Sequence, residues 1–386
     1  MSPGAERLKR LPPYMFAAIE QKIAAKKEAG VDVITLGIGD PDVPTPDFIV
    51  KALQEHAARP DTHQYPSNRG RVSFREAFAG FYERRFGVSL DPDTEIIPCL
   101  GAKEAIANIN LAFLDPGDTA LGSDPGYPVY TTGPIIAGAE PLPMPLEPEL
   151  GFQPDLDAIP PGVADAARLM FLNYPNNPTG AVIEDDFFER VVGFAKRHDL
   201  IVVHDNAYSE LTYDGYVAPS FLETPGAKDI GIEVFSLSKP WNMTGWRTGA
   251  VLGNADLVNA YWQLKTNLDS GMFEAVQEAT VAALESDQSC VRDMIAIYQR
   301  RRDTLVEALR TIGLEVTPPK GAIYIWAQAP EGTDSRTFTE RVLEEADVVI
   351  SPGAAFGPSG EGFVRMSLTL EDDRLNEAAE RISKLV

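Results

Sequence analysis

Cysteine and histidine are scarce in this sequence of 386 residues, which contains two cysteines and four histidines. Cys99 and Cys290 are too few for a disulfide framework or a cysteine-based metal cluster. The histidines show no H-x-x-x-H spacing, so the sequence offers no zinc site of that kind. We therefore expect a function that uses no metal ion.

Basic residues are also few, with 34 lysines and arginines against 57 aspartates and glutamates and a formal net charge of −23. Such a charge opposes binding to nucleic acid and to anionic membranes, so we expect neither as a partner. A well-solvated acidic surface is the ordinary explanation of this charge. It is compatible with a local basic pocket that binds an anionic ligand.

Long apolar runs are missing as well. The longest, such as residues 200–203, are far too short to cross a bilayer. The basic residues near the N-terminus are not followed by the apolar segment that is typical of signal peptides. We expect a cytoplasmic protein.

The middle of the chain alternates short β-branched runs with helical patterns, which is typical of βαβ units on a mainly parallel sheet. The apolar patterns predict helices at residues 102–114 and 185–197. The expected strands are residues 94–98, 119–123, 168–173, 200–204, 233–236 and 249–253. We therefore predict an α/β fold with a large domain of residues 46–286.

After about residue 287 the pattern changes, because two long helical stretches, 291–312 and 335–345, surround short strands. The strands are expected at residues 314–317, 322–326 and 348–351. This arrangement predicts a smaller α+β domain made of residues 1–45 and 287–386.

The strongest chemical pattern is the run SLSKPWNMTGWR. A lysine taken alone is most often a flexible surface cation. Here Lys239 ends an apolar β run, and Pro240 prevents the ordinary continuation of a helix or strand. Imine chemistry requires a partly desolvated lysine whose amine is available unprotonated. The nearby Ser236, Ser238 and Arg247 are suitable ligands for a phosphate dianion.

A second pattern, HDNAY, follows a fully apolar run, so Asp205 is expected at the carboxyl end of a strand, where α/β folds bind ligands. For an isolated aspartate at a strand end, capping of a helix would be the favoured explanation. Pyridoxal-5′-phosphate (PLP) needs a carboxylate that keeps its ring nitrogen protonated. Tyr208, three residues later, could donate to the ring phenolate.

Three further segments fit the same ligand. Asn177, in NYPNNPTG, again follows an apolar strand, although this composition alone predicts only a turn. Gly101, Ala102 and Lys103 open a helix whose free N–H groups could bind a phosphate. Tyr127, in DPGYP, could stack on a planar ring, although a single tyrosine more often belongs to a core.

Together these segments resemble the fold-type I PLP-dependent enzymes, the aspartate aminotransferase-like class I and II family, over nearly the whole chain. The combination of S-x-S-K-x-x-x-M-x-G-W-R with N-N-P-T-G is highly specific. The resemblance implies that Lys239 holds PLP as a Schiff base and moves protons, while Asp205 pairs with the ring nitrogen. It also implies that Asn177 and Tyr208 contact the phenolate and that Tyr127 stacks on the ring. The implied phosphate contacts are Ser236, Ser238, Arg247 and the N–H groups of Ala102 and Lys103, which follow Gly101.

The resemblance also implies substrate and subunit contacts. Arg365, in FVRMS, resembles the clamp for a substrate α-carboxylate, a bidentate role that lysine fills poorly. Gly39 would offer a backbone N–H to the same carboxylate, beside Asn177. Tyr65, in HQYP, resembles the residue that reaches the partner subunit's phosphate, so a homodimer with shared sites is expected. Ala102 stands where the family usually has a serine or threonine, so the hydroxyl contact that the family makes to the phosphate there is not expected here.

Within the family, the runs RLPPYMFA, LGIGDPDVPTP and DSGMFEAVQE are similar to the LL-diaminopimelate aminotransferases. Those enzymes interconvert LL-diaminopimelate plus 2-oxoglutarate with tetrahydrodipicolinate plus glutamate, a step of lysine biosynthesis. The similarity implies recognition of a distal ammonium and carboxylate. Tyr14 is the best candidate for that role, followed by Asn267 and Ser270.

Other enzyme classes fit the sequence less well. The S-x-x-K motif of serine acyl-enzymes needs a helix start and companion motifs that the sequence lacks. A nicotinamide fingerprint fails because Asp42 stands where its third glycine should be. A PLP-dependent sensor would need an appended DNA-binding module and a basic face, and the sequence has neither the spare length nor the basic face. Aminotransferases for alanine, aspartate or aromatic amino acids, and a PLP-dependent C–S β-lyase, remain the alternatives.

Overall fold

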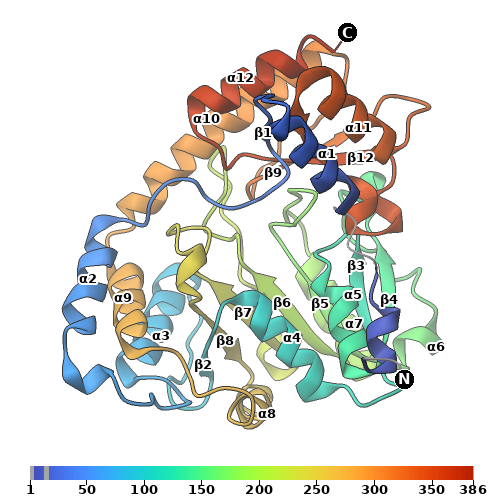
Figure 1. Ribbon diagram of the computed structural model, residues 1–386. Coiled ribbons are helices and arrows are strands. Elements are labelled where there is room, and N and C mark those ends of the chain that lie inside the picture. Colours follow the sequence, from blue (N-terminus) through green and yellow to red (C-terminus); the bar gives the residue numbers. More distant parts are fainter. Residues whose placement is uncertain (1–3, 13–16, 386) are drawn as a thin grey trace.

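A seven-stranded sheet lies at the centre of the computed structural model, which describes residues 4–12 and 17–385 (Figure 1). The strand order is β2-β8-β7-β6-β5-β3-β4, and every neighbouring pair is parallel except the two that involve β8. The strands are β2 (Ile96–Cys99), β3 (Thr119–Asp124), β4 (Glu140–Pro145), β5 (Ala167–Leu172), β6 (Ile201–Asn206), β7 (Gly231–Ser236) and β8 (Gly249–Gly253). The prediction of a mainly parallel α/β sheet is confirmed.

Strand β4 was not predicted from the sequence because it is rich in proline. Pro141, Pro143 and Pro145 occupy alternate positions, so their missing N–H groups all fall on one side of the strand. As β4 is the edge strand, that side needs no hydrogen-bonding neighbour. A proline-rich run can therefore be a strand here, whereas in a central strand it would break the ladder.

Helices cover both faces of this sheet, because alternate residues of each central strand belong to different cores. Leu169 and Phe171 of β5 pack with α4, whereas Met170 and Leu172 pack on the opposite face with α3 and α7. The helices of this part are α2 (Asp47–Ala57), α3 (Val72–Phe86), α4 (Ala102–Phe113), α5 (Val129–Ala137), α6 (Pro161–Ala164), α7 (Phe187–His198), α8 (Ala255–Lys265) and α9 (Glu274–Glu285). The sheet is thus buried on both sides, as parallel sheets require.

A second group of elements, from the two ends of the chain, lies above the carboxyl edge of the sheet (Figure 1). Its antiparallel sheet has the order β11-β12-β9, and β1 pairs in parallel with β10. The elements are α1 (Ala17–Glu28), β1 (Ile34–Thr35), α10 (Ser289–Thr311), β9 (Tyr324–Gln328), α11 (Ser335–Ala346), β10 (Val348–Val349), β11 (Ser351–Pro352), β12 (Phe363–Ser367) and α12 (Asp372–Ile382). The division into residues 46–286 and residues 1–45 plus 287–386 stays a prediction.

Short 3-10 helices complete the chain, at Glu6–Arg10, Pro60–Thr62, Pro148–Leu150, Phe221–Glu223, Ala227–Asp229, Thr244–Trp246, Gly353–Phe356 and Pro358–Gly360. Across residues 4–12 and 17–385, no helix is both long and apolar enough to span a membrane.

The strand expected at residues 314–317 is wrong. Leu314 and Val316 are buried, so the alternation that suggested a strand is real. The segment nevertheless forms no ladder, and Gln328 donates to its Glu315 carbonyl across 3.4 Å. Pro318 and Pro319 follow at once and supply no donors. The pattern reflects packing on the core without sheet pairing.

A buried polar network joins β6 and β7 beneath the carboxyl edge. Glu233 has no exposed surface, and one carboxylate oxygen lies 2.6 Å from His204 Nδ1 and accepts from the Phe221 N–H at 2.7 Å. The other oxygen accepts from the hydroxyls of Ser220 (2.8 Å) and Tyr82 (2.9 Å). Because the buried Asn206 amide also donates to this second oxygen, at 3.4 Å, five buried groups depend on one carboxyl group.

We expect Glu233→Ala to lower the free energy of unfolding by about 3 kcal/mol or more, because it leaves those groups buried and unpaired. Urea denaturation followed by circular dichroism measures the change. Glu184→Ala is the control, since its ion pair with Lys320 is solvent-exposed and should contribute about 0–1 kcal/mol. Equal losses in the two variants would contradict this account.

Candidate active site

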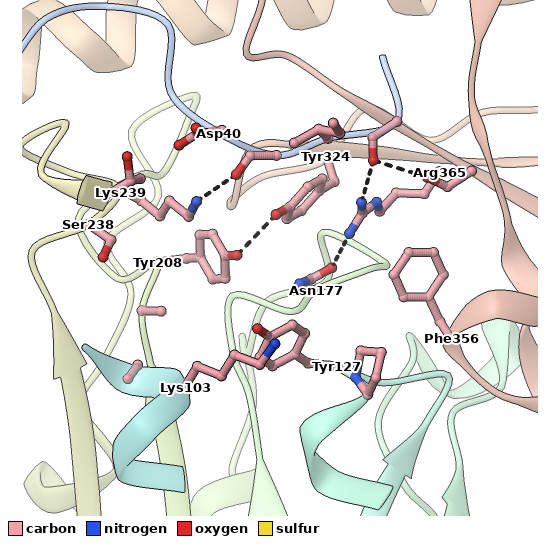
Figure 2. Close-up of a pocket in the computed structure, with 18 of the residues that line it drawn as sticks. Asp40, Lys103, Tyr127, Asn177, Tyr208, Ser238, Lys239, Tyr324, Phe356 and Arg365 are labelled. Carbon is pink, nitrogen blue, oxygen red and sulfur yellow. Dashed lines mark hydrogen bonds between the residues drawn. The ribbon is translucent and has the colours of Figure 1, made fainter. Parts of the chain in front are cut away.

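The carboxyl ends of β5, β6 and β7 open into a cavity of about 620 Å³, which segments from the terminal parts of the chain close from above (Figure 2). Neighbouring parallel strands end at similar levels, so the polar runs that follow them lie side by side. Twelve residues named from the sequence line this cavity: Gly39, Ala102, Lys103, Tyr127, Asn177, Asp205, Tyr208, Ser236, Ser238, Lys239, Arg247 and Arg365.

Lys239 follows β7 and extends its amine into the cavity (Figure 2). Its Nζ donates to the Gly39 carbonyl at 2.5 Å. Burial lowers the pKa of Lys239 below its ordinary value, because the charged ammonium is the form that desolvation disfavours. The geometry therefore favours an amine that can act as a nucleophile or base.

Asp205 lies on β6 with its side chain buried. One carboxylate oxygen accepts from the Tyr130 hydroxyl at 2.8 Å, while Oδ1 is buried without a partner. Burial raises the pKa of Asp205 to about 6, and the Tyr130 hydrogen bond opposes that rise. Tyr130 is itself held by stacking on Phe171, with ring centroids 5.6 Å apart. An unpaired buried carboxylate oxygen is a suitable acceptor for a protonated ring nitrogen.

The turn before α4 approaches Arg247 closely. Gly101 has φ +87°, which strains other residues, and a Cβ atom there would lie 2.2 Å from an Arg247 guanidinium nitrogen and displace it. Another nitrogen of Arg247 donates to the Thr244 carbonyl at 2.7 Å, which fixes the guanidinium beside the N-terminus of α4. The free N–H groups of that helix and the cation form a cradle for an anion.

Arg365, on β12, points into the cavity from the opposite wall. It donates to the side-chain oxygen of Asn177 and to the Gly37 carbonyl, both at 2.9 Å, and its Nε is buried without a partner. Its guanidinium carbon lies 4.2 Å from the ring centre of Tyr324 and 4.4 Å from that of Phe356. Two aromatic rings thus hold the cation, while one of its donors remains available.

Tyr208 and Tyr324 meet above the cavity floor, with their hydroxyl oxygens 3.2 Å apart (Figure 2). The Tyr324 ring also lies against Gly39. A side chain at position 39 would collide with it, since a Cβ there would lie 2.2 Å from the Tyr324 hydroxyl. Burial raises the pKa of Tyr208 well above its ordinary value, so its hydroxyl stays protonated and can donate.

Some residues named from the sequence do not line the cavity. Tyr65 is 88% exposed, Asn267 and Ser270 are exposed, and Gly101 acts through its contact with Arg247. Tyr14 lies outside the described residues. Four residues of the site were not named from the sequence: Tyr324, Phe356 and Asp40 line the cavity, and Tyr130 donates to Asp205. Their roles depend on contacts with distant segments, for which the local sequence carries no signal.

The residues present fit PLP. The unpaired Asp205 oxygen matches its pyridinium nitrogen, and the cradle of Arg247 and α4 matches its phosphate. The partly buried Lys239 amine lies 2.5 Å from a backbone carbonyl, and its pKa is lowered by desolvation, as imine chemistry with the PLP aldehyde requires. No group of three or more potential metal ligands occurs in the described part of the chain.

Comparisons with known proteins agree with this geometry. The family model of class I and II aminotransferases matches residues 31–382. The LL-diaminopimelate aminotransferase of Moorella thermoacetica is 52% identical over 382 residues, which cover 99% of this chain and 98% of that protein. Substrate-bound BacF from Bacillus subtilis is 39% identical with a TM-score of 0.94, over 100% of this chain and 98% of that chain. A mutant aspartate aminotransferase from Thermus thermophilus is 30% identical with a TM-score of 0.92, over 100% of both chains.

Tyr130→Phe removes the hydroxyl that donates to Asp205, so we expect the pKa of this carboxyl to rise further above about 6 in the cofactor-free protein. A carboxyl whose pKa is raised on folding contributes stability at low pH that is lost as the pH rises through the folded pKa. The variant should therefore lose this contribution at a higher pH than the wild type. Urea unfolding between about pH 4 and about pH 8 measures the shift.

Asp205→Asn is the control, made both alone and together with Tyr130→Phe. It removes the titrating group, so the two proteins that carry it should no longer differ in the pH dependence of their stability. The same difference persisting without Asp205 would contradict the assignment of the shift to this pair.

Proposed function

Because this chain belongs to the class I and II aminotransferases, we propose that it transfers an amino group from LL-diaminopimelate to 2-oxoglutarate. The protein is a PLP-dependent transaminase. The proposed products are tetrahydrodipicolinate and glutamate, in lysine biosynthesis. The observation that supports this substrate is the high identity, over almost the whole chain, to the Moorella thermoacetica enzyme.

We propose that Arg365 binds the α-carboxylate of the amino acid. Its guanidinium is buried between two rings, and its unpaired Nε can complete a bidentate contact. Asn177 already bonds this guanidinium and would hold it in orientation, while the Gly39 N–H would support the carboxylate. Every amino acid has this carboxylate, so these contacts bind donors without selecting among them.

The chemistry at the α-carbon is assigned to Lys239 and Asp205. PLP supplies an electron sink for the substrate when it is bound. Lys239, with its pKa lowered by burial, accepts and returns the α-proton at its Nζ. The Asp205 carboxylate keeps the ring nitrogen protonated, and the Tyr208 hydroxyl donates to the ring oxygen together with Asn177. Ser236, Ser238, Arg247 and the N–H groups of Ala102 and Lys103 are assigned to the phosphate, with Tyr127 over the ring.

A homodimer with shared sites is part of this proposal. Tyr65 is exposed in the single chain, as a residue that reaches a partner's phosphate would be. Leu268 and Phe273 are large apolar side chains that are also exposed, on the segment that carries Asn267 and Ser270. The proposed compartment is the cytoplasm, which suits the free Cys99 and Cys290.

We expect LL-diaminopimelate to exceed alanine, aspartate and phenylalanine in kcat/KM by about tenfold or more, with 2-oxoglutarate as acceptor. A pocket built for a second amino-acid head leaves buried polar groups unpaired when a shorter donor binds. Glutamate formation measured with each donor decides the question. A clear preference for alanine or an aromatic donor would contradict the substrate, and release of ammonia and pyruvate from a cysteine-type substrate would indicate a β-lyase.

Two variants separate the shared from the selective contacts. Arg365→Lys should lower kcat/KM for every donor by about tenfold or more, because a lysine cannot make the bidentate contact. Tyr14→Phe should weaken LL-diaminopimelate more than glutamate, because we assign Tyr14 to the distal head. The ratio of kcat/KM for these two donors is the measurement. An equal loss for both donors in Tyr14→Phe would remove Tyr14 from that role.

A further inference from the structure

Lys265, at the end of α8, is a fully buried cation that the proposed reaction does not use. Its Nζ lies 2.5 Å from an Asp269 carboxylate oxygen and 3.6 Å from a Glu104 carboxylate oxygen. A buried ammonium is costly unless it is paired, and here two carboxylates from different segments balance it. Its removal would leave both carboxylates without their cation.

Glu104 connects this cation to the turn that precedes α4. One of its oxygens accepts from the Leu100 N–H at 2.9 Å, and the other accepts from Asn108 at 2.5 Å. Leu100 immediately precedes Gly101, which lies close to the Arg247 guanidinium. A small movement of Glu104 would therefore shift the backbone that is assigned to the phosphate.

Asp269 connects the same cation to the segment after α8. Its other oxygen accepts from the Gly271 N–H at 2.7 Å. Gly271 has φ +88°, and a Cβ there would lie 3.0 Å from Pro66, next to the exposed Tyr65. This segment therefore packs on the loop that carries Tyr65.

We propose that Lys265 is a positioning residue: through Glu104 it holds the phosphate turn, Leu100 to Lys103, and through Asp269 it fixes the segment 266–273 relative to that turn. The inference rests on the proposed function, since it takes the turn before α4 to be the phosphate site. Lys265 touches neither cofactor nor substrate in this proposal, and its effect is carried by the two carboxylates.

Titration of the cofactor-free full-length protein with PLP and with pyridoxal tests the proposal. Pyridoxal has the same ring and aldehyde but no phosphate, so it does not use the turn. Lys265→Met should raise the Kd for PLP by about tenfold or more and that for pyridoxal by less than about twofold. A merely structural role would weaken both ligands alike.

Glu104→Gln is the second variant, because an amide oxygen can still accept from Leu100 but carries no charge to pair with Lys265. It should lower the preference for PLP over pyridoxal by a smaller factor than Lys265→Met, and it carries the test if Lys265→Met fails to fold. Asp269→Asn should leave the preference near that of the wild type and speed proteolysis within residues 266–273.

Arg302→Met is the matched control, since Arg302 is a buried cation, 4% exposed, paired with Asp214 far along the chain from the turn. It should lower stability without changing the preference for PLP. Arg247→Met tests the phosphate site itself. If Arg247→Met leaves the ratio of the Kd for pyridoxal to the Kd for PLP unchanged, the proposed phosphate site is wrong. If Arg247→Met lowers the preference and neither Lys265→Met nor Glu104→Gln does, this inference alone is overturned.

Discussion

The burial of charge at the carboxyl edge of a parallel sheet is the constraint on which this site depends. Strands β5, β6 and β7 pair in parallel, so the segments that follow them converge on one cavity. Asp205 and Arg365 are buried there and Lys239 is partly buried, so desolvation shifts the pKa of each group toward its neutral form. Asp205 Oδ1 and Arg365 Nε lack partners there. Such groups favour a ligand of complementary charge, because binding removes a desolvation cost that the fold leaves uncompensated.

The fold was largely predictable because each central strand is an apolar run bounded by polar or turn-forming residues. Strand β8, for example, has the predicted bounds. Two of the errors have opposite causes. In β4, an edge position tolerates prolines that would exclude a central strand, and the sequence does not reveal which strand is at the edge. At residues 314–317, burial without pairing produced a strand-like alternation.

Site residues could be predicted where a short local motif identifies them, but not where their role depends on a tertiary contact. Lys239, Asp205 and Asn177 occur in short motifs at or just after the carboxyl ends of strands, so their convergence could be inferred from the topology. Tyr130 and Tyr324 could not be inferred, because their partners Asp205 and Tyr208 lie 75 and 116 residues away. Their hydroxyls act only through tertiary contacts, and a tyrosine in an apolar segment is ordinarily a core residue.

Two lysines, the partly buried Lys239 and the fully buried Lys265, show that the partners of a charged group determine its role more than burial alone does. Lys239 faces a backbone carbonyl at 2.5 Å, and burial lowers its pKa, so its amine is available for chemistry. Lys265 is buried even more completely, but carboxylates lie 2.5 and 3.6 Å away and balance its charge. A carbonyl solvates an ammonium without neutralising it, whereas a carboxylate forms an ion pair. The same side chain is therefore suited to reaction in one setting and to holding two segments in place in the other.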